Sequence, residues 1–390
     1  MVAAAAGFTV VGFTRLPEQA LEHFSSARAQ WWWFPLRRTR RARIAAMNPF
    51  ASVWLQFAAC MLLIGVAGHQ LASAGDQIAR RTGLSGSWIG LALLATVTSL
   101  PELATGITSV TLADAPNLAL GDALGSCVIN LAFLVVVDFL HRSQPLYSRA
   151  SQGHILAAGF GVILLGFIGI SILLGQALPT SGPSSLKSLQ FSFSLSTPVI
   201  LLLYLVAVRA VFVYERGHAD AAAAPHDSPQ DPPLSKVVRR FAVAGAVVVG
   251  AGLWLPFVAV ELAATMGWSR SFVGTLFVAF ATSVPELAVT LSALRLGALD
   301  LAIGNLLGSN LFNVAIIAID DLFYTKGPLL AHVSPVHAMT AGSAVIMTGL
   351  AVVGLFYRPT DRVLRAVGWI SLGLFAVYLL NAYVLYLHGD

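Results

Sequence analysis

Charged residues are scarce in this sequence of 390 residues. Asp, Glu, Lys and Arg make up 11% of it and hydrophobic residues 57%, whereas soluble proteins carry roughly 25% charged residues. So few charges cannot cover the water-facing surface of the two or three soluble domains that this length would otherwise suggest. The sequence therefore predicts a polytopic membrane protein.

Cysteine is scarce as well. Cys60 and Cys127 are the only two, and both lie inside apolar runs, so no disulfide framework is expected. The formal net charge is +5, yet the basic residues are scattered through short loops or gathered in one N-terminal stretch. This distribution does not indicate nucleic-acid binding, and we expect no nucleic-acid partner.

Long apolar runs are abundant. Ten of them can cross about 30 Å of hydrocarbon, which takes roughly 20 helical residues. Each is expected to be a helix, because backbone groups in lipid need internal partners and no β-alternation is visible. The expected limits are 51–73, 87–112, 117–139, 153–177, 195–214, 238–263, 271–296, 299–319, 336–357 and 362–387.

A linker at 215–236 separates two groups of five spans. It contains Ala221–Ala224 followed by four prolines, a composition that predicts a solvated segment without a core. We therefore expect a first five-helix unit over 47–214 and a second over 237–390.

The basic residues of the loops predict an orientation. Thirteen Lys and Arg residues lie in loops after odd-numbered spans, the linker included, and three lie in the others. Because Lys and Arg are enriched in cytoplasmic loops, we expect a multi-pass protein of the plasma (inner) membrane with a cytoplasmic linker and both termini outside. Residues 1–46 contradict this rule with seven arginines. We expect them to be a doubtful extension before a true start at Met47; a basic arm or a targeting segment is the alternative.

Two blocks of the first unit recur in the second. Gly83–Ala104 (GLSGSWIGLALLATVTSLPELA) aligns without gaps with Gly267–Ala288 (GWSRSFVGTLFVAFATSVPELA), with 11 identities in 22 positions. Leu118–Leu131 aligns with Leu301–Val314, with 7 identities in 14 positions. Because each unit has an odd number of spans, the second must enter the membrane from the opposite side. The sequence thus predicts an all-α fold of ten transmembrane helices in two inverted-topology five-helix repeats, an architecture of many secondary transporters.

Glu102 and Glu286 occupy equivalent mid-span positions in the two copies. A carboxylate near the bilayer centre costs roughly 2.5–3.5 kcal/mol on insertion scales, and no Lys or Arg lies in the interior of any span to pair with either. Together they carry a charge of −2, which one divalent cation would neutralise; protons are the alternative. With carbonyls and hydroxyls they form an all-oxygen ligand set, which suits Ca²⁺ and tolerates Na⁺.

A proline precedes each glutamate, at Pro101 and Pro285. Proline lacks an N–H and clashes with the preceding turn, so the helix is expected to break there and to free carbonyl oxygens for a cation. Hydroxyls on the same broken turn can add ligands. They belong to Thr98, Ser99, Thr282 and Ser283.

The second block places a serine and an asparagine on one helix face, because they are spaced i, i+4. The pairs are Ser126 with Asn130 and Ser309 with Asn313. We expect the asparagines at the site, since each recurs with its serine. Glycines of the same block are expected to let helices pack closely.

Other acidic residues compete for a role. Asp122 stands where the second copy has Asn305, and Glu261 lies near the end of the sixth span; both are candidates for the ion pathway. The acids at span ends are expected at the membrane interface. These are Asp138, Asp320 and Asp321.

The segments TSLPE and TSVPE, joined to GSCVIN and GSNLFN, resemble the cation/calcium antiporter superfamily, and most of all its prokaryotic sodium/calcium exchanger branch. The resemblance covers 47–390. It implies that Glu102 and Glu286 are the central Ca²⁺ ligands, and that the carbonyls of Thr98 and Thr282 and the side chains of Asn130 and Asn313 complete the centre. It also implies flanking Na⁺ sites. Their ligands would be Ser99, Ser283, Ser126, Ser309 and the carbonyls of Ala95 and Ala279.

The chain departs from the family pattern at several positions. Val97 and Ala281 stand where the family usually has glycine, and Cys127 replaces an asparagine. Some relatives carry a carboxylate where Asn313 stands, so this centre has one fewer charge.

The predicted function is secondary active antiport of Ca²⁺ against Na⁺ by alternating access, in which the spans at 51–73 and 238–263 slide past the site. Exchange of Ca²⁺ or another divalent cation for H⁺ is the alternative, because two protons would also balance the glutamates. A cation channel could use the same repeat. An intramembrane hydrolase would need a general base near Ser99 or Ser283, and none is present. We therefore expect no enzyme activity, no cofactor besides the transported ions, and the lipid bilayer and small cations as partners of a chain that can act as a monomer.

Overall fold

The computed structural model describes most of the chain after its first 47 residues. The described ranges are 48–81, 94–140, 146–177, 194–218, 232–359, 362–363 and 367–389. The basic stretch 1–46 and most of the predicted linker lie outside the described residues.

Eight helices in these ranges are long and apolar enough to cross a membrane, and each overlaps one predicted span. They are α1 (Pro49–Arg81), α4 (Pro116–Leu140), α6 (Gly153–Ala177), α8 (Ser196–His218), α9 (Leu234–Met266), α13 (Leu299–Phe323), α14 (Val336–Tyr357) and α15 (Trp369–His388). The polytopic all-α class is therefore confirmed. The span predicted at 87–112 begins outside the described residues and continues as α3 (Leu100–Thr111), so the count of ten stays a prediction.

A ninth crossing is bent by 44° if its two parts form one span. The first part joins α10 (Arg270–Phe272), a π-helix η3 (Val273–Val278) and α11 (Ala279–Thr282), and the second part is α12 (Val284–Arg295). The break falls just before Pro285, where proline was expected to interrupt the helix.

The last span begins later than predicted. Residues within 362–368 include the strands β1 (Arg362–Val363) and β2 (Val367–Gly368), which pair antiparallel, and α15 begins at Trp369. The predicted start at 362 is therefore wrong, because Arg362–Val363 and Val367–Gly368 pair as strands instead of continuing the helix. Two further short elements are α5 (Leu146–Arg149) and the 3₁₀-helix η4 (Leu329–Ala331).

The helices α4 and α13 lie at the centre of the bundle. Within the apolar window of each helix, 72% of α4 and 83% of α13 is buried, against 22% of α8. The two helices pack on each other, and α3 and α12 pack on both of them. The second block of the repeat therefore forms the middle of the fold, next to the broken turns of the first block.

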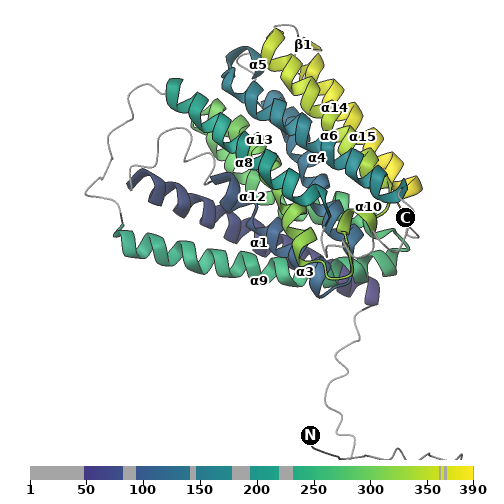
Figure 1. Ribbon diagram of the computed structural model, residues 1–390. Helices are drawn as coiled ribbons and strands as arrows, with labels where there is room; N and C mark the ends of the chain where they lie inside the picture. Colours follow the sequence, from purple (N-terminus) through teal and green to yellow (C-terminus); the bar gives the residue numbers. More distant parts are fainter. Residues whose placement is uncertain are drawn as a thin grey trace, which may run out of the picture. The chain divides into compact units, whose positions relative to one another are not determined.

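The two longest helices, α1 and α9, lie side by side along their length (Figure 1). Each also packs on the helix that follows the broken turn of the other half, α1 on α12 and α9 on α3. Gly68 and Gly252, equivalent positions of the repeat, make these contacts. A Cβ on Gly68 would collide with the Pro285 ring, and one on Gly252 would lie 3.1 Å from the Pro101 carbonyl oxygen. Only glycine permits such close approach of helix to turn.

Two aspartates cap the fifth helix of the opposite half. Asp138 on α4 accepts hydrogen bonds from the Gly368 N–H (2.8 Å) and the Ser371 hydroxyl (2.7 Å) at the start of α15. Its repeat equivalent, Asp321 on α13, accepts from the Ser194 N–H (2.6 Å) and from the Thr197 hydroxyl at the start of α8. Both residues lie near the ends of their helices and are buried caps there. Their expected position at the membrane interface stays a prediction.

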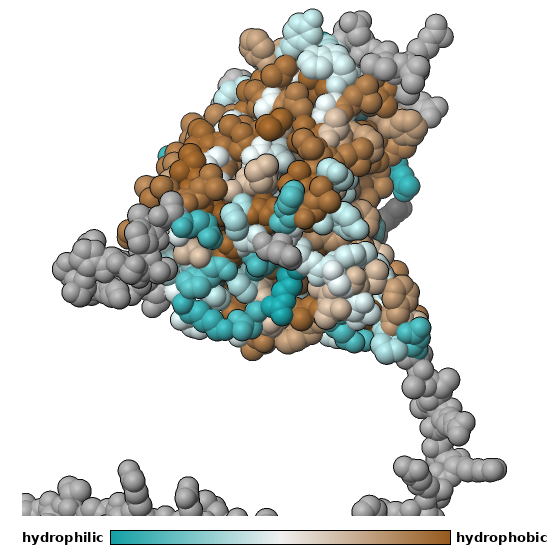
Figure 2. All heavy atoms as spheres, turned by 90° about the vertical axis from the view of Figure 1, so that its right-hand side faces the viewer, coloured by the Kyte–Doolittle hydropathy of each residue, from teal (hydrophilic) through white to brown (hydrophobic). Residues whose placement is uncertain are grey.

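Apolar side chains cover much of the outer surface. Figure 2 shows hydrophobic residues over the upper part of one face and hydrophilic residues gathered lower down. Large apolar side chains such as Leu202 and Leu205 of α8 are more than 60% exposed, which is unfavourable in water and favourable against lipid tails.

Candidate cation-binding site

The broken turns lie at equivalent places in the two halves and have matching backbone geometry. Ser99 has φ −88° and ψ 14°, and Ser283 has φ −82° and ψ 4°. In each half the proline stands in the first turn of the following helix, where its missing N–H leaves no hydrogen bond unmade. The glutamate follows directly, so Glu102 and Glu286 sit in the first turns of α3 and α12.

Each glutamate accepts hydrogen bonds from both halves. Glu286 Oε1 accepts from the Ser99 hydroxyl across the repeat boundary (3.0 Å) and from Ser309 of its own half (3.4 Å). Glu102 Oε1 accepts in the same way from Ser283 (3.3 Å) and Ser126 (3.5 Å). The structure thus brings the two predicted blocks of each copy together around two carboxylates.

Both carboxylates are buried, at 1% and 0% exposure, and close enough for their charges to interact. The second oxygen of each, Oε2, has no hydrogen-bond partner among the described residues. In the same part of the chain, no three His, Cys, Asp or Glu side chains are grouped so as to hold a metal ion. Any cation bound here would therefore take ligands from the two glutamates together with hydroxyls, amides and carbonyls.

The threonines and carbonyls of the broken turns are also buried. Thr98 donates to the Ala95 carbonyl (3.2 Å) and contacts the Ser309 hydroxyl. The Ala95 carbonyl also accepts from the Ser99 N–H (3.1 Å), and the Ala279 carbonyl from the Ser283 N–H (3.0 Å). The Ala279 carbonyl also accepts from the Ser126 and Thr282 hydroxyls. Because a carbonyl has two lone pairs, a cation bound at either carbonyl would replace a hydroxyl donor.

Three asparagines and a cysteine meet where α4 crosses α13. Asn130 donates to the Asn310 side-chain oxygen (3.0 Å), and Asn310 donates to the Cys127 carbonyl (3.1 Å). The Oδ1 of Asn130 and both polar atoms of Asn313 are buried with no hydrogen-bond partner in the described ranges. The two predicted asparagines thus keep polar atoms for a ligand.

Asp122 lies beside the other half's broken turn. Its Oδ1 accepts from the Thr282 hydroxyl at 2.9 Å, and its Oδ2 is buried without a hydrogen-bond partner in the described chain. The equivalent Asn305 donates to the Glu286 carbonyl and to Thr290 instead. The predicted pathway residue therefore adjoins the site.

Sequence comparison covers most of the chain. The profile of the family described as sodium/calcium exchanger protein matches residues 52–213 and 236–384. The chain belongs to this family.

One curated relative matches most of this chain, and another matches a shorter part of it. Inner membrane protein YrbG of Escherichia coli is 26% identical over 83% of this chain and 94% of its own. Sodium/calcium exchanger MaX1 of Methanosarcina acetivorans is 40% identical over a shorter match, which covers 20% of this chain and 23% of its own.

Solved exchanger structures share the fold of this family member. One structure of the sodium-calcium exchanger NCX_Mj aligns with a TM-score of 0.55 and 24% identity, over 85% of this chain and 97% of the other. The H⁺/Ca²⁺ exchanger CAX aligns with a TM-score of 0.63 and 15% identity, over 85% and 81%.

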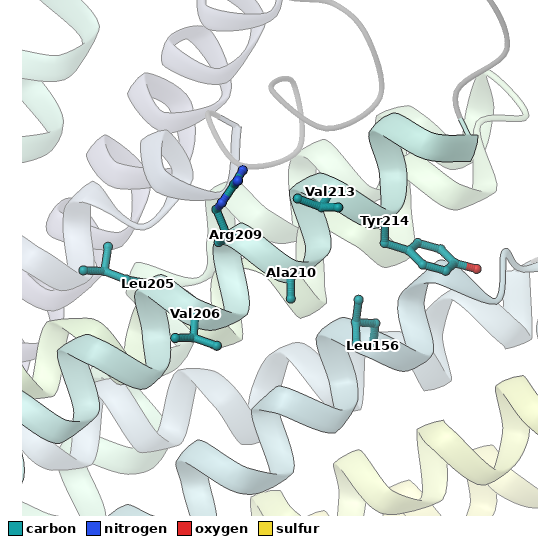
Figure 3. A pocket seen from close by; sticks show the side chains of 7 residues that line it. All are labelled: Leu156, Leu205, Val206, Arg209, Ala210, Val213 and Tyr214. Atoms are coloured by element: carbon teal, nitrogen blue, oxygen red, sulfur yellow. The ribbon is translucent and has the colours of Figure 1, made fainter.

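Glu261 does not lie with the residues around Glu102 and Glu286 in this structure. It lies on α9 and is exposed, and it makes no hydrogen bond to the site in the described chain. A surface groove of about 670 Å³ between α6 and α8 is also separate from the glutamates. Figure 3 shows its apolar lining, with Arg209 and Tyr214 as its polar side chains.

Three residues at or next to the candidate site were not predicted from the sequence. Asn310 was passed over because its repeat equivalent is Cys127, which breaks the pattern. Gly68 and Gly252 were missed because they lie outside the two aligned blocks. One signal in the sequence could have predicted these two glycines. An Ala-Gly pair stands at 67–68 and again at 251–252, at the same offset as the first aligned block.

Proposed function

We propose that this chain is a secondary active antiporter that exchanges Ca²⁺ for Na⁺ across the membrane, with Glu102 and Glu286 as the shared cation ligands. The observation that carries this proposal is the buried carboxylate pair. Neither carboxylate has a basic partner among the described residues, and each keeps an oxygen without a hydrogen bond. Buried charges are normally paired or bound to metal, so a cation from outside is the natural partner.

Charge balance supports exchange at this site. The pair carries −2, which one Ca²⁺ or two Na⁺ neutralise. One Ca²⁺ and two Na⁺ therefore compete for the same oxygens. They cannot bind together without excess positive charge. Hydroxyls of Ser99, Ser283, Ser126 and Ser309 would hold the carboxylates and flank the Na⁺ positions, and Thr98, Thr282, Asn130 and Asn313 would add oxygens around Ca²⁺.

The mutual packing of α1 and α9 supports alternating access. These helices contact each other along their length and approach the broken turns closely at Gly68 and Gly252. They would slide as a pair past a fixed core of α3, α4, α12 and α13, opening the site to one side at a time. The ten-helix inverted repeat, the cytoplasmic linker and the outside termini belong to the same proposal.

Transport measurements test this function. Purified protein in proteoliposomes is expected to take up radioactive Ca²⁺ when an outward Na⁺ gradient is imposed, and Glu102→Gln or Glu286→Gln should abolish the uptake. Asp114→Asn is the matched control, because Asp114 is an exposed acid that pairs with Lys326 at 2.6 Å. If Glu102→Gln transports as fast as the unaltered protein, the proposal fails.

Exchange of Ca²⁺ or another divalent cation for H⁺ is the second candidate. It is supported by the carboxylate oxygens without partners, which can take protons, and by the fold shared with CAX. Uptake that follows an imposed pH gradient and ignores Na⁺ would favour it. Single-channel currents in place of saturable counterflow would favour a cation channel.

A further inference from the structure

A second set of polar groups lies one helical turn from Glu102. Gly106 follows Glu102 by four residues on α3, and Asp122 precedes Ser126 by four residues on α4. Since residues four apart share a helix face, and Ser126 bonds Glu102, Gly106 and Asp122 are neighbours on the two packed helices. Both lie on the side where residues 112–115 connect α3 to α4.

Asp320 reaches this place from α13. A Cβ built on Gly106 would lie 2.7 Å from Asp320 Oδ1 and would also collide with Oδ2. The carboxylate therefore points at the α3 backbone, and only glycine leaves room for it. The end of α13 is on the same side as the loop 112–115, because Lys326 just beyond it pairs with Asp114.

Three oxygens of this set are buried and have no hydrogen-bond partner among the described residues. They are Asp122 Oδ2, Asp320 Oδ1 and the Oγ of Ser109, which follows Gly106 by three residues on α3 and so shares its helix face. The carboxylates of Asp122 and Asp320 are close enough for their charges to interact, and both residues are only 1% exposed. Asp320 lies near the end of α13, and it is a buried acid whose Oδ1 has no hydrogen-bond partner in the described chain.

The repeat equivalents of these four residues are neutral. Gly106, Ser109 and Asp122 align with Thr290, Ala293 and Asn305, and Asp320 aligns with Val137. Thr290 and Asn305 are joined by a hydrogen bond of 3.4 Å. Three positions of the first half and Asp320 of the second half thus differ from their repeat equivalents, and together they remove bulk and add two carboxylates and a hydroxyl. A helix-packing role alone would not require that combination.

We propose that Asp122, Asp320 and Ser109 form a second cation site, separate from the glutamate pair and lying between it and the 112–115 side of the membrane. Its −2 charge and oxygen ligands suit one hard divalent cation, with water completing the coordination. A role for this second site in holding Ca²⁺ before transport rests on the proposed function. Binding of a cation at this second site does not depend on the proposed function.

Calcium binding to the purified full-length protein, measured by equilibrium dialysis with radioactive Ca²⁺, separates the two sites. Glu102→Gln/Glu286→Gln removes the central pair, and this double variant is expected to keep one bound Ca²⁺. Adding Asp320→Asn should weaken the remaining binding about tenfold or more, the scale seen when groups supporting a metal are lost. Gly106→Thr, which introduces the second half's residue, should do the same by displacing the carboxylate, and Asp114→Asn should change nothing.

The outcomes are distinct. If the double variant binds no Ca²⁺, or if its residual binding ignores both Asp320→Asn and Gly106→Thr, the second site does not exist, whatever the transport assay shows. If residual binding depends on Asp320 while the unaltered protein shows no exchange, the second site stands and the proposed antiport falls. Monodisperse elution of each variant on size exclusion excludes misfolding as the cause of lost binding.

Discussion

The Ser99 hydroxyl of one half donates a 3.0 Å hydrogen bond to the Glu286 carboxylate of the other. Its repeat equivalent, Ser283, does the same for Glu102 at 3.3 Å. Each carboxylate is thus held partly by the half to which it does not belong. Displacing one broken turn relative to the other would change both cation ligands at once.

Replacing Ser99 by alanine tests this cross-half contact. A hydrogen bond to a charged group contributes roughly 1.5–3 kcal/mol, so Ser99→Ala is expected to raise the apparent Kd for Ca²⁺ about tenfold or more. Equilibrium binding of Ca²⁺ to the purified protein measures it. Ser292→Ala is the control, since that hydroxyl bonds only the Ala288 carbonyl of its own helix (2.8 Å). Equal weakening by both variants would point to a general loss of packing.

Gly68→Ala tests the proposed sliding of α1 and α9. The added methyl would collide with Pro285, and overpacking of this kind costs roughly 1–3 kcal/mol. We expect a slower exchange rate with nearly unchanged Ca²⁺ binding, because the glutamates are not touched. Gly250→Ala on α9 is the matched control, as nothing lies within 4 Å of its Cβ position. Unchanged transport by Gly68→Ala would argue against sliding at this contact.

Asp138→Ala tests the capping of α15. The loss leaves the Gly368 N–H and the Ser371 hydroxyl without this acceptor. The expected cost is roughly 1.5–3 kcal/mol in the free energy of unfolding, visible as a lower Tm in detergent. Counter-ion preference should stay the same, because Asp138 does not touch the glutamates. A changed Na⁺ dependence with an unchanged Tm would contradict the capping role.

Asn313→Asp tests whether the negative charge of the central site sets the number of Na⁺ ions exchanged for one Ca²⁺. The side chain of Asn313 is buried with no hydrogen-bond partner in the described chain, so the change would raise the central charge from −2 to −3 and accommodate a third Na⁺. We expect electroneutral exchange by the unaltered protein and current-carrying exchange by the variant, measured as a membrane potential in proteoliposomes. Asn313→Ser, which adds no charge, should remain electroneutral.

Much of the fold was predictable because membrane spans follow from the length of apolar runs. The duplicated blocks also predicted which side chains would meet, since equivalent residues of two copies approach one another around a common centre. Glu102 and Glu286 were found because a carboxylate without a basic partner is conspicuous in an apolar span.

Other features depended on packing that a sequence pattern does not report. Asp138, Asp320 and Asp321 all looked like residues of span ends, and the sequence alone did not distinguish two helix caps from a buried acid beside Gly106. The start of α15 at Trp369 was missed because apolar content does not reveal that Arg362–Val363 and Val367–Gly368 pair as strands.

The caps on α8 and α15 have a consequence for biosynthesis. When the first 214 residues have left the ribosome, the start of α8 still lacks Asp321, the acceptor for its Ser194 N–H, since that residue has yet to be translated. Until the late half is made, α8 is therefore held by its packing on α6 of the early half and lacks this cap. Expressed as separate fragments, neither half should mature by itself, whereas co-expression should restore assembly.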